Sequence, residues 1–318
     1  MKNMQTSRRN ILKTIGAAAG LTTLPHLSFG YSLSNEYPKP LTSKDFLPCL
    51  NMSTIRGQNL GFVKELEVAS KAGFTAVEIW MRTLQVYLDS GGTIKEAAKI
   101  LKDLGLTVED GMSFTQWVVD EEDTRAKAIE TLKKEMDLLA VLGCKRIAAP
   151  PSGFNGKPGL NLDKAAERYA AILDIGDQTG VIPQLEIWGS SQNLSQLSEA
   201  LYVAAKSGHP SAKILLDVYH LYRGGTSVDA LRIIRPETVE LIHINDYPDA
   251  PRETLKDSDR VYPGDGVAPI STILKALQSP KRPLVLSFEV FNQEYYKQDA
   301  LEVCKTGLAK INKVTQGL

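Results

Sequence analysis

Three carboxylates and one imidazole lie at the ends of apolar runs in the second half of the chain. These runs are rich in β-branched residues and are bounded by turn residues, which is typical of buried parallel strands. A metal-binding or proton-carrying side chain at the end of such a strand has little structural use unless the strand ends open onto a site. The four residues are Glu186, Asp217, His243 and Glu289.

This set of side chains predicts one divalent metal ion. Oxygen-rich ligation favours Mn²⁺ or Mg²⁺, whereas an imidazole favours Mn²⁺, Co²⁺ or Zn²⁺. Without a cation, three carboxylates converging in a partly buried pocket would repel one another. Mn²⁺ is therefore the favoured metal, with Mg²⁺, Co²⁺ and Zn²⁺ as alternatives. For any one of the acids taken alone, an ordinary salt bridge is the competing interpretation.

Predicted strands and helices alternate from residue 46 onward. The predicted strands cover residues 46–53, 75–80, 106–112, 146–149, 182–188, 213–218, 239–244 and 284–290. The predicted helices cover residues 60–72, 94–104, 123–142, 162–179, 194–206, 228–234, 270–277 and 295–314. Strict alternation implies parallel strands with helical crossovers, and eight such units predict a single-domain (β/α)8 TIM barrel. A doubly wound sheet is the alternative, but residues 51–57 lack the Gly-x-Gly-x-x-Gly turn of that fold.

Composition narrows the classes of function. The chain has 318 residues, and its 37 basic and 37 acidic side chains balance. This balance argues against a nucleic-acid partner bound through bulk charge. The 3 cysteines are odd in number and far apart, so no disulfide framework is expected and all three are predicted to be buried.

The first 30 residues differ from the rest. Residues 7–13 read Ser-Arg-Arg-Asn-Ile-Leu-Lys, a close match to the bacterial twin-arginine export signal, and a weakly apolar run follows. We therefore predict a signal peptide over residues 1–30, a linker over residues 31–45 and the barrel over residues 46–318. The expected partner is the twin-arginine export machinery, and the expected location is the periplasm.

The motifs around the strand ends resemble the xylose isomerase-like barrel superfamily, in the branch of sugar phosphate isomerases and epimerases that includes ketose 3-epimerases. The similarity covers essentially all of residues 46–314. It is carried by the segments 185–188 (Leu-Glu-Ile-Trp), 216–220 (Leu-Asp-Val-Tyr-His), 242–246 (Ile-His-Ile-Asn-Asp) and 288–289 (Phe-Glu), together with Arg260 and the turn 263–266 (Pro-Gly-Asp-Gly).

The resemblance implies roles for particular residues. It implies that one metal ion, often Mn²⁺, is bound by Glu186, Asp217, His243 and Glu289, and that the two glutamates also transfer the proton. It further implies that His220 and Arg260 contact the substrate. The segment between His243 and Arg260 is longer than expected for these epimerases, and its insert, residues 247–253, is a candidate substrate lid. Arg252 in that segment is therefore an alternative to Arg260.

The same chemistry follows from the residue types. Isomerising or epimerising a sugar requires removal of a proton next to a carbonyl, and a metal can act as the Lewis acid that stabilises the enediolate. Carboxylates on opposite faces can remove and return the proton, and we assign this pair to Glu186 and Glu289. Trp188, Trp80, Phe114 and Trp117 are candidates for stacking on a sugar ring. Glu78 also ends a strand, and we interpret it as a structural ion-pair partner.

The favoured function is thus a metal-dependent isomerase or epimerase of an unphosphorylated sugar or keto-sugar. An exported enzyme meets few phosphorylated metabolites, and the chain has no Gly-rich phosphate loop. A lyase or dehydratase acting on a keto-sugar, keto-inositol or 3-keto-glycoside is the main alternative. A multi-zinc phosphodiesterase would need more histidines than His209, His220 and His243, and an inactive sugar-binding protein would not need four intact ligands. The sugar, the reacting carbon and the oligomeric state, including a homo-oligomer, stay open.

Overall fold

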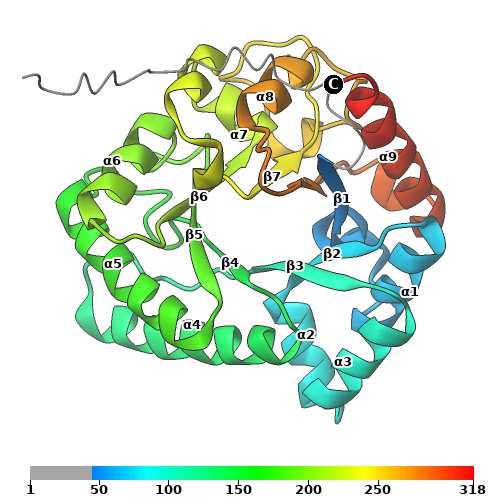
Figure 1. Ribbon diagram of the computed structural model, residues 1–318, viewed down its shortest axis with the longest axis horizontal. Coiled ribbons are helices and arrows are strands. Elements are labelled where there is room, and N and C mark those ends of the chain that lie inside the picture. The colour runs from blue at the N-terminus through cyan, green and yellow to red at the C-terminus, as the bar shows by residue number, and fades with distance from the viewer. Residues whose placement is uncertain (1–44) are drawn as a thin grey trace, which may run out of the picture. The chain divides into compact units, whose positions relative to one another are not determined.

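The computed structural model describes residues 45–318, which form one α/β domain. Eight parallel strands follow the order β3-β2-β1-β8-β7-β6-β5-β4 and curl into a near-closed barrel (Figure 1). The predicted TIM barrel is confirmed. The predicted signal peptide and the linker as far as residue 44 lie outside the described residues. The strands are β1 Phe46–Asn51, β2 Ala76–Trp80, β3 Thr107–Met112, β4 Arg146–Ala149, β5 Ile182–Glu186, β6 Lys213–Asp217, β7 Leu241–Ile244 and β8 Leu284–Phe288.

Helices surround the strands (Figure 1). They are α1 Phe62–Ala72, α2 Met81–Asp89, α3 Ile94–Asp103, α4 Glu122–Val141, α5 Leu162–Thr179, α6 Leu197–Ser207, α7 Val218–Arg223, α8 Ile270–Leu277 and α9 Ala300–Thr315. Short 3-10 helices cover Met52–Gln58 (η1), Val228–Ile233 (η2), Pro236–Thr238 (η3), Asp257–Asp259 (η4) and Tyr295–Lys297 (η5). Among the described residues, none of the helices combines the length and apolar character needed to cross a bilayer.

The predicted elements differ from the structure mainly where strands end. Strands β1, β5, β6 and β8 end earlier than predicted. The residues after β1 and β6 begin the helices η1 and α7, and those after β5 and β8 form loops. Helices α2 and α7 were not predicted. The predicted helix 228–234 is the 3-10 helix η2, and the predicted helix 295–314 begins only at Ala300. There the side chain of Asp299 caps the helix by accepting from the backbone N–H groups of Leu301 and Glu302.

Inside the barrel, a small apolar layer supports the strand ends. It consists of Cys49, Ala76, Met112, Ala148, Leu215, Leu241 and Val285. Below this layer, at the N-terminal ends of the strands, Arg146 pairs with Glu109 at 2.9 Å and with Glu240 at 3.1 Å. Lys213 pairs with Glu240 at 3.0 Å. These ion pairs lie at the N-terminal end of the barrel. The predicted metal ligands lie at the C-terminal end, where TIM barrels place their active sites.

The cysteine prediction is also confirmed. Cys49, Cys144 and Cys304 are all buried and free. Burial raises the pKa of each thiol, which keeps the unreactive protonated form at neutral pH. All three therefore act as small apolar side chains in the core.

The contact between α9 and β8 sets the position of the strand that leads to Glu289. A Cβ added at Gly307 would lie 2.2 Å from the Phe288 ring. Gly307→Ala should therefore lower the free energy of unfolding by about 1–3 kcal/mol through overpacking, measured by urea denaturation. Gly156→Ala is the matched control, because no atom lies within 4 Å of a Cβ there. Equal unfolding midpoints for the two variants would contradict this packing.

Candidate metal centre and active site

The four side chains predicted as metal ligands come together at the C-terminal ends of the strands. Asp217, His243 and Glu289 offer ligand atoms that all lie within 4.8 Å of one another. Within the described part of the chain, this is the one such group of His, Cys, Asp or Glu side chains. Glu186 lies beside the group, with its Oε1 3.7 Å from His243 Nδ1. All four are at most 3% exposed.

Asp217 is fixed by the helix that starts directly after it. Its Oδ1 accepts from the backbone N–H of His220 at 2.8 Å and so caps α7. Its Oδ2 accepts from Asn245 Nδ2 at 3.1 Å, and Asn245 Oδ1 in turn accepts from the Tyr219 N–H at 3.0 Å. The Asp-x-x-His spacing in the sequence is therefore a capping arrangement, which directs His220 toward the site.

Glu289 is held by donors that follow the two strands beside β8. Its Oε1 accepts from Asn51 Nδ2 at 3.1 Å and from Ser53 Oγ at 3.3 Å. Its Oε2 lies 3.2 Å from His243 Nδ1 and accepts from Arg260 Nη1 at 2.8 Å. Three donors to one carboxylate favour its ionised form.

Glu78 orients the imidazole of His243. Its Oε1 lies 3.1 Å from His243 Nε2, and its Oε2 accepts from Ser287 Oγ at 2.5 Å. Glu78 is thus an ion-pair partner, as interpreted from the sequence, but its partner is one of the predicted metal ligands. A carboxylate on one ring nitrogen places the other nitrogen toward the ligand group, as in many histidine–metal sites.

The site meets the requirements of a divalent cation. His243 Nδ1 and Glu186 Oε2 are buried and have no hydrogen-bond partner among the described residues. With Nε2 held by Glu78, Nδ1 faces Asp217 Oδ2 at 3.6 Å and Glu289 Oε2 at 3.2 Å, so it can carry a proton in the metal-free protein or offer its lone pair to a bound cation. Acceptors that converge in this way need a cation between them. Carboxylates and an imidazole are ligands that Mn²⁺, Co²⁺ and Zn²⁺ accept.

The electrostatic environment gives Glu186 and Glu289 different pKa values. Burial raises the pKa of Glu186 to about 8, with His243 opposing the rise and Glu289 adding to it. Burial would also raise the pKa of Glu289, but His243 and Arg260 lower it to about 2. Burial would lower the pKa of His243, yet Glu289 and Glu78 raise it well above its ordinary value. Before a divalent cation binds, Glu186 therefore carries a proton at neutral pH, whereas Glu289 does not.

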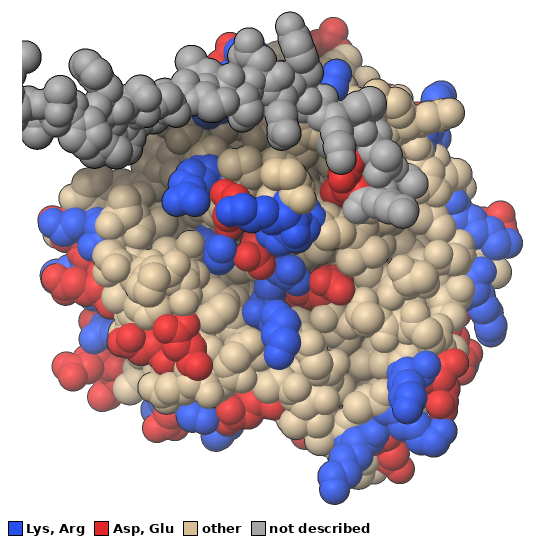
Figure 2. Space-filling model, in the orientation of Figure 1, with Lys and Arg blue, Asp and Glu red and all other residues tan. Residues whose placement is uncertain are grey.

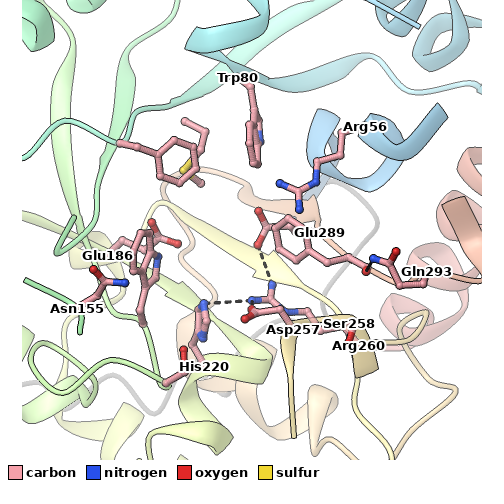
Figure 3. Close-up of a pocket in the computed structure, with 15 residues that line it drawn as sticks. Arg56, Trp80, Asn155, Glu186, His220, Asp257, Ser258, Arg260, Glu289 and Gln293 are labelled. Carbon is pink, nitrogen blue, oxygen red and sulfur yellow. Dashed lines mark hydrogen bonds and ion pairs between the residues drawn. The ribbon is translucent and has the colours of Figure 1, made fainter. Parts of the chain in front are cut away.

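A cavity of about 450 Å³ opens above these ligands (Figure 3). Its volume falls within the range of small-molecule sites. Trp80, Phe114 and Trp188 line one part of it, with ring centres 5.0 Å apart for Trp80 and Phe114 and 6.2 Å apart for Phe114 and Trp188. The remaining lining is mostly polar and includes Arg56, Asn155, Glu186, Ser190, His220, Asp257, Ser258, Arg260, Glu289 and Gln293.

The predicted substrate residues have different surroundings. Trp188 and His220 line the cavity, whereas Trp117 is fully buried and donates to the Pro150 carbonyl. His220 Nε2 lies 3.1 Å from Arg260 Nη2. Because a guanidinium only donates, Nε2 accepts this bond and the ring proton lies on Nδ1. A substrate oxygen near His220 would therefore share or replace the bond from Arg260.

The structure separates the two candidate arginines. Arg260 is fully buried in the site and donates to Asp217 at 2.9 Å, to Glu289 at 2.8 Å and to Asp257 at 2.5 Å. Arg252 is exposed, pairs with Glu253 at 2.7 Å and does not line the cavity. Arg260 therefore lies in the site, whereas Arg252 lies outside the cavity.

The longer segment before Arg260 forms part of the cavity wall. Within it, Leu255 is buried, and its carbonyl accepts from Tyr219 Oη at 3.2 Å. Asp257 and Ser258, near its end, line the cavity. These residues directly follow the predicted lid, residues 247–253, and they contribute an acid beside Arg260.

Sequence reasoning missed several residues that follow strand β1. Asn51 bonds Glu289 and also accepts from Trp80 Nε1 at 3.2 Å. Arg56, in the 3-10 helix η1, lines the cavity. Both come from the same barrel end as the predicted ligands, so extending the search to the residues after every strand would have found them.

Comparison with known proteins places the fold in a family. Residues 66–309 match the family described as Xylose isomerase-like TIM barrel. The chain belongs to this family. The match spans most of the described barrel and includes all four predicted ligands, so the family resemblance inferred from the motifs is confirmed at this level.

Two curated proteins show moderate sequence similarity to this chain. An inosose isomerase of Bacillus velezensis is 27% identical over 262 residues, covering 81% of this chain and 93% of that protein. The inosose isomerase of Bacillus subtilis is 26% identical over 266 residues, covering 81% and 94%.

Solved structures show the same fold. The structure of the IOLI protein with a bound zinc atom superposes with a TM-score of 0.78 at 23% identity, covering 85% of this chain and 98% of that chain. An L-ribulose 3-epimerase gives a TM-score of 0.68 at 21% identity, covering 85% and 95%.

The contact between Glu78 and His243 can be tested by metal binding. Glu78→Gln keeps the size of the side chain but removes the charge that orients the imidazole, so Zn²⁺ or Mn²⁺ affinity should fall about 10- to 100-fold in calorimetric titrations. Glu109→Gln is the matched control, because Glu109 is a part-buried acid at the opposite end of the barrel. Unchanged affinity in Glu78→Gln, with native circular dichroism, would contradict the assigned role.

Proposed function

We propose that this protein is a divalent-metal-dependent isomerase or epimerase of an unphosphorylated sugar or keto-sugar. The observation that carries the proposal is the placement of Glu186 and Glu289 on opposite sides of one cavity, both beside His243 Nδ1 (Figure 3). The inosose isomerases among the relatives, and the ketose epimerases that share the fold, support the same reaction class.

The proposed ligands are Glu186, Asp217, His243 and Glu289. Bound there, a divalent cation would supply Lewis-acid polarisation of a substrate carbonyl, which acidifies the neighbouring C–H. Mn²⁺ is the metal we favour, because three carboxylates and one imidazole match its preference for mixed oxygen and nitrogen ligands. The zinc atom in the IOLI protein supports a divalent metal without choosing among these ions.

The two glutamates are proposed to move the proton. Glu289 is fixed by Asn51, Ser53 and Arg260 and is ionised, which suits a base that removes a proton from the substrate. Glu186 has an unpartnered Oε2 facing the site, so it is free to take up and deliver a proton on the other face. Environments that push two carboxyl groups apart in pKa suit acid and base roles.

The cavity wall is proposed to orient a polyhydroxylated ring or chain. Trp80, Phe114 and Trp188 offer apolar surface to the C–H face of a sugar and exclude water from the reacting carbon. Asn155, Ser190 and Gln293 offer hydrogen-bond partners for hydroxyl groups.

Glu289→Gln tests this assignment. Because Glu289 is also a proposed ligand, the variant should bind metal more weakly, so it is assayed at a metal concentration that saturates the site. Its turnover should then fall about 10²- to 10⁴-fold, because one general base is lost. The measurement is NMR in D₂O with a panel of ketoses, aldoses and inososes, in which deuterium at one carbon identifies the exchanged proton. Arg252→Gln is the control, because it changes an exposed side chain outside the cavity. Full turnover by metal-loaded Glu289→Gln would exclude Glu289 as the base.

A lyase or dehydratase is the second candidate. The same proton removal leads to elimination when the next carbon carries a leaving group. Asp257 favours this alternative, because it is a half-exposed carboxylate that lines the cavity outside the ligand group and could accept a hydrogen bond from a leaving hydroxyl group. The proton removed from the carbon would be returned to the leaving oxygen by the base that took it. Product analysis separates the two reactions, since a lyase releases water or an alcohol and an epimerase does not.

We also propose that the protein is exported to the periplasm by the twin-arginine pathway. The support is the motif at residues 7–13, followed by an apolar run. Replacing both Arg8 and Arg9 by Lys should leave the protein in the cytoplasmic fraction of a bacterial host, whereas the wild-type chain should appear in the periplasmic fraction on immunoblots. Equal periplasmic amounts of the two would contradict twin-arginine export.

A further inference from the structure

Arg56 is a cation at the mouth of the cavity. It follows β1 in the 3-10 helix η1, and its guanidinium carbon lies 5.1 Å from the centre of the Trp80 ring and 4.7 Å from the centre of the Phe291 ring. Figure 3 shows its guanidinium directed into the cavity above Glu289. Arg56 is exposed, whereas His243 at the floor is fully buried. It therefore faces the end of a bound molecule that is remote from the imidazole.

No acidic side chain within residues 45–318 balances the charge of Arg56. Of the two arginines that line the cavity, Arg260 is balanced by Asp217, Glu289 and Asp257. Arg56 forms no ion pair with any acid in the part of the chain that the structure describes. The two arginines thus have separate tasks: Arg260 neutralises the buried carboxylates, and Arg56 keeps a free positive charge toward the ligand.

The contacts of Arg56 prepare it for a planar anion. Ring faces of Trp80 and Phe291 hold the guanidinium by cation–π contacts, and Tyr296 is a hydrogen-bonding neighbour of Arg56. These contacts restrict its motion and leave the N–H groups that face the cavity available. This edge matches a carboxylate in bidentate geometry. The neutral side chains of Ser258 and Gln293 also line the cavity and could bind hydroxyl groups, so recognition of hydroxyls does not require a free guanidinium.

We propose that Arg56 is a specificity-determining residue that binds a carboxylate on the substrate, and that the substrate class is a keto-sugar acid. This inference rests on the proposed function of the same site. The carbonyl end of the sugar would lie at the ligand group, and the carboxylate, at the far end of the carbon chain, would lie at the N–H edge of Arg56. A phosphate ester fits less well, because the sequence has no Gly-rich loop to supply converging backbone N–H groups.

The test compares two sugars that differ only at the end remote from the carbonyl. D-Fructuronate carries a carboxylate at the position where D-fructose carries a hydroxymethyl group. With metal-loaded wild-type protein, kcat/KM for D-fructuronate should exceed that for D-fructose. Arg56→Gln should reduce this ratio about 10- to 100-fold, as expected when a charge-assisted hydrogen bond is lost. Arg56→Lys keeps the charge without the planar fork, so its ratio should fall between the two.

Arg252→Gln is the matched control, because it removes an exposed arginine that does not line the cavity. Its substrate ratio should equal that of the wild type. A wild-type ratio of one or less, or a preference for D-fructuronate that persists in Arg56→Gln, would overturn the inference.

Calorimetric binding of the same two sugars separates this inference from the proposed function. If neither sugar exchanges deuterium but D-fructuronate binds more tightly in an Arg56-dependent way, the proposed reaction fails and the recognition role of Arg56 stands. If both sugars react and bind equally well in the wild type, the reaction stands and the role of Arg56 fails.

Discussion

The arrangement of this site depends on the balance of buried charge at one end of the barrel. Four carboxylates, those of Glu78, Glu186, Asp217 and Glu289, surround the imidazole of His243 with almost no exposure to solvent. Charges removed from water in this way are tolerated only when they are paired and hydrogen-bonded. One guanidinium, that of Arg260, offsets part of the negative charge, and a divalent cation would offset the rest.

The effect of the buried negative charge is largest at Glu186. Glu289 and Asp217 share the Arg260 guanidinium and stay ionised, whereas Glu186 lacks such a partner, and burial raises its pKa to about 8. A cation at His243 Nδ1 would favour the ionised form of Glu186 and release its proton. Binding of the metal and the state of the proposed acid–base pair are therefore linked by the same electrostatics.

The fold tolerates this concentration of buried charge because an apolar layer and fixed hydrogen-bond donors surround it. The apolar layer through Cys49, Leu215 and Val285 separates the acids from the ion pairs of Arg146 at the lower end. Backbone and amide donors then restrain the acids one by one, as Asn51 does for Glu289 and Asn245 does for Asp217. Burying these polar groups costs free energy unless they are hydrogen-bonded. The strands that carry them hold each group within reach of its partner.

The sequence predicted the barrel and the ligand residues because both follow local rules. Apolar runs mark buried strands, and polar residues at the ends of parallel strands must share one rim of the sheet. The pairing of Arg260 with Asp217 and Glu289 could not be predicted in this way, because it joins residues 43 and 29 positions apart through the barrel interior. The position of Arg56 depends similarly on Trp80 and Phe291, which come from other strand ends.

The most direct test of the account is anomalous X-ray diffraction from crystals grown with Mn²⁺, recorded at the manganese absorption edge. The account predicts a single strong anomalous peak among Glu186, Asp217, His243 Nδ1 and Glu289, with Arg260 still bonded to the carboxylates at its edge. Diffraction that shows no anomalous peak between these four side chains, or places the bound cation elsewhere on the protein, would contradict it.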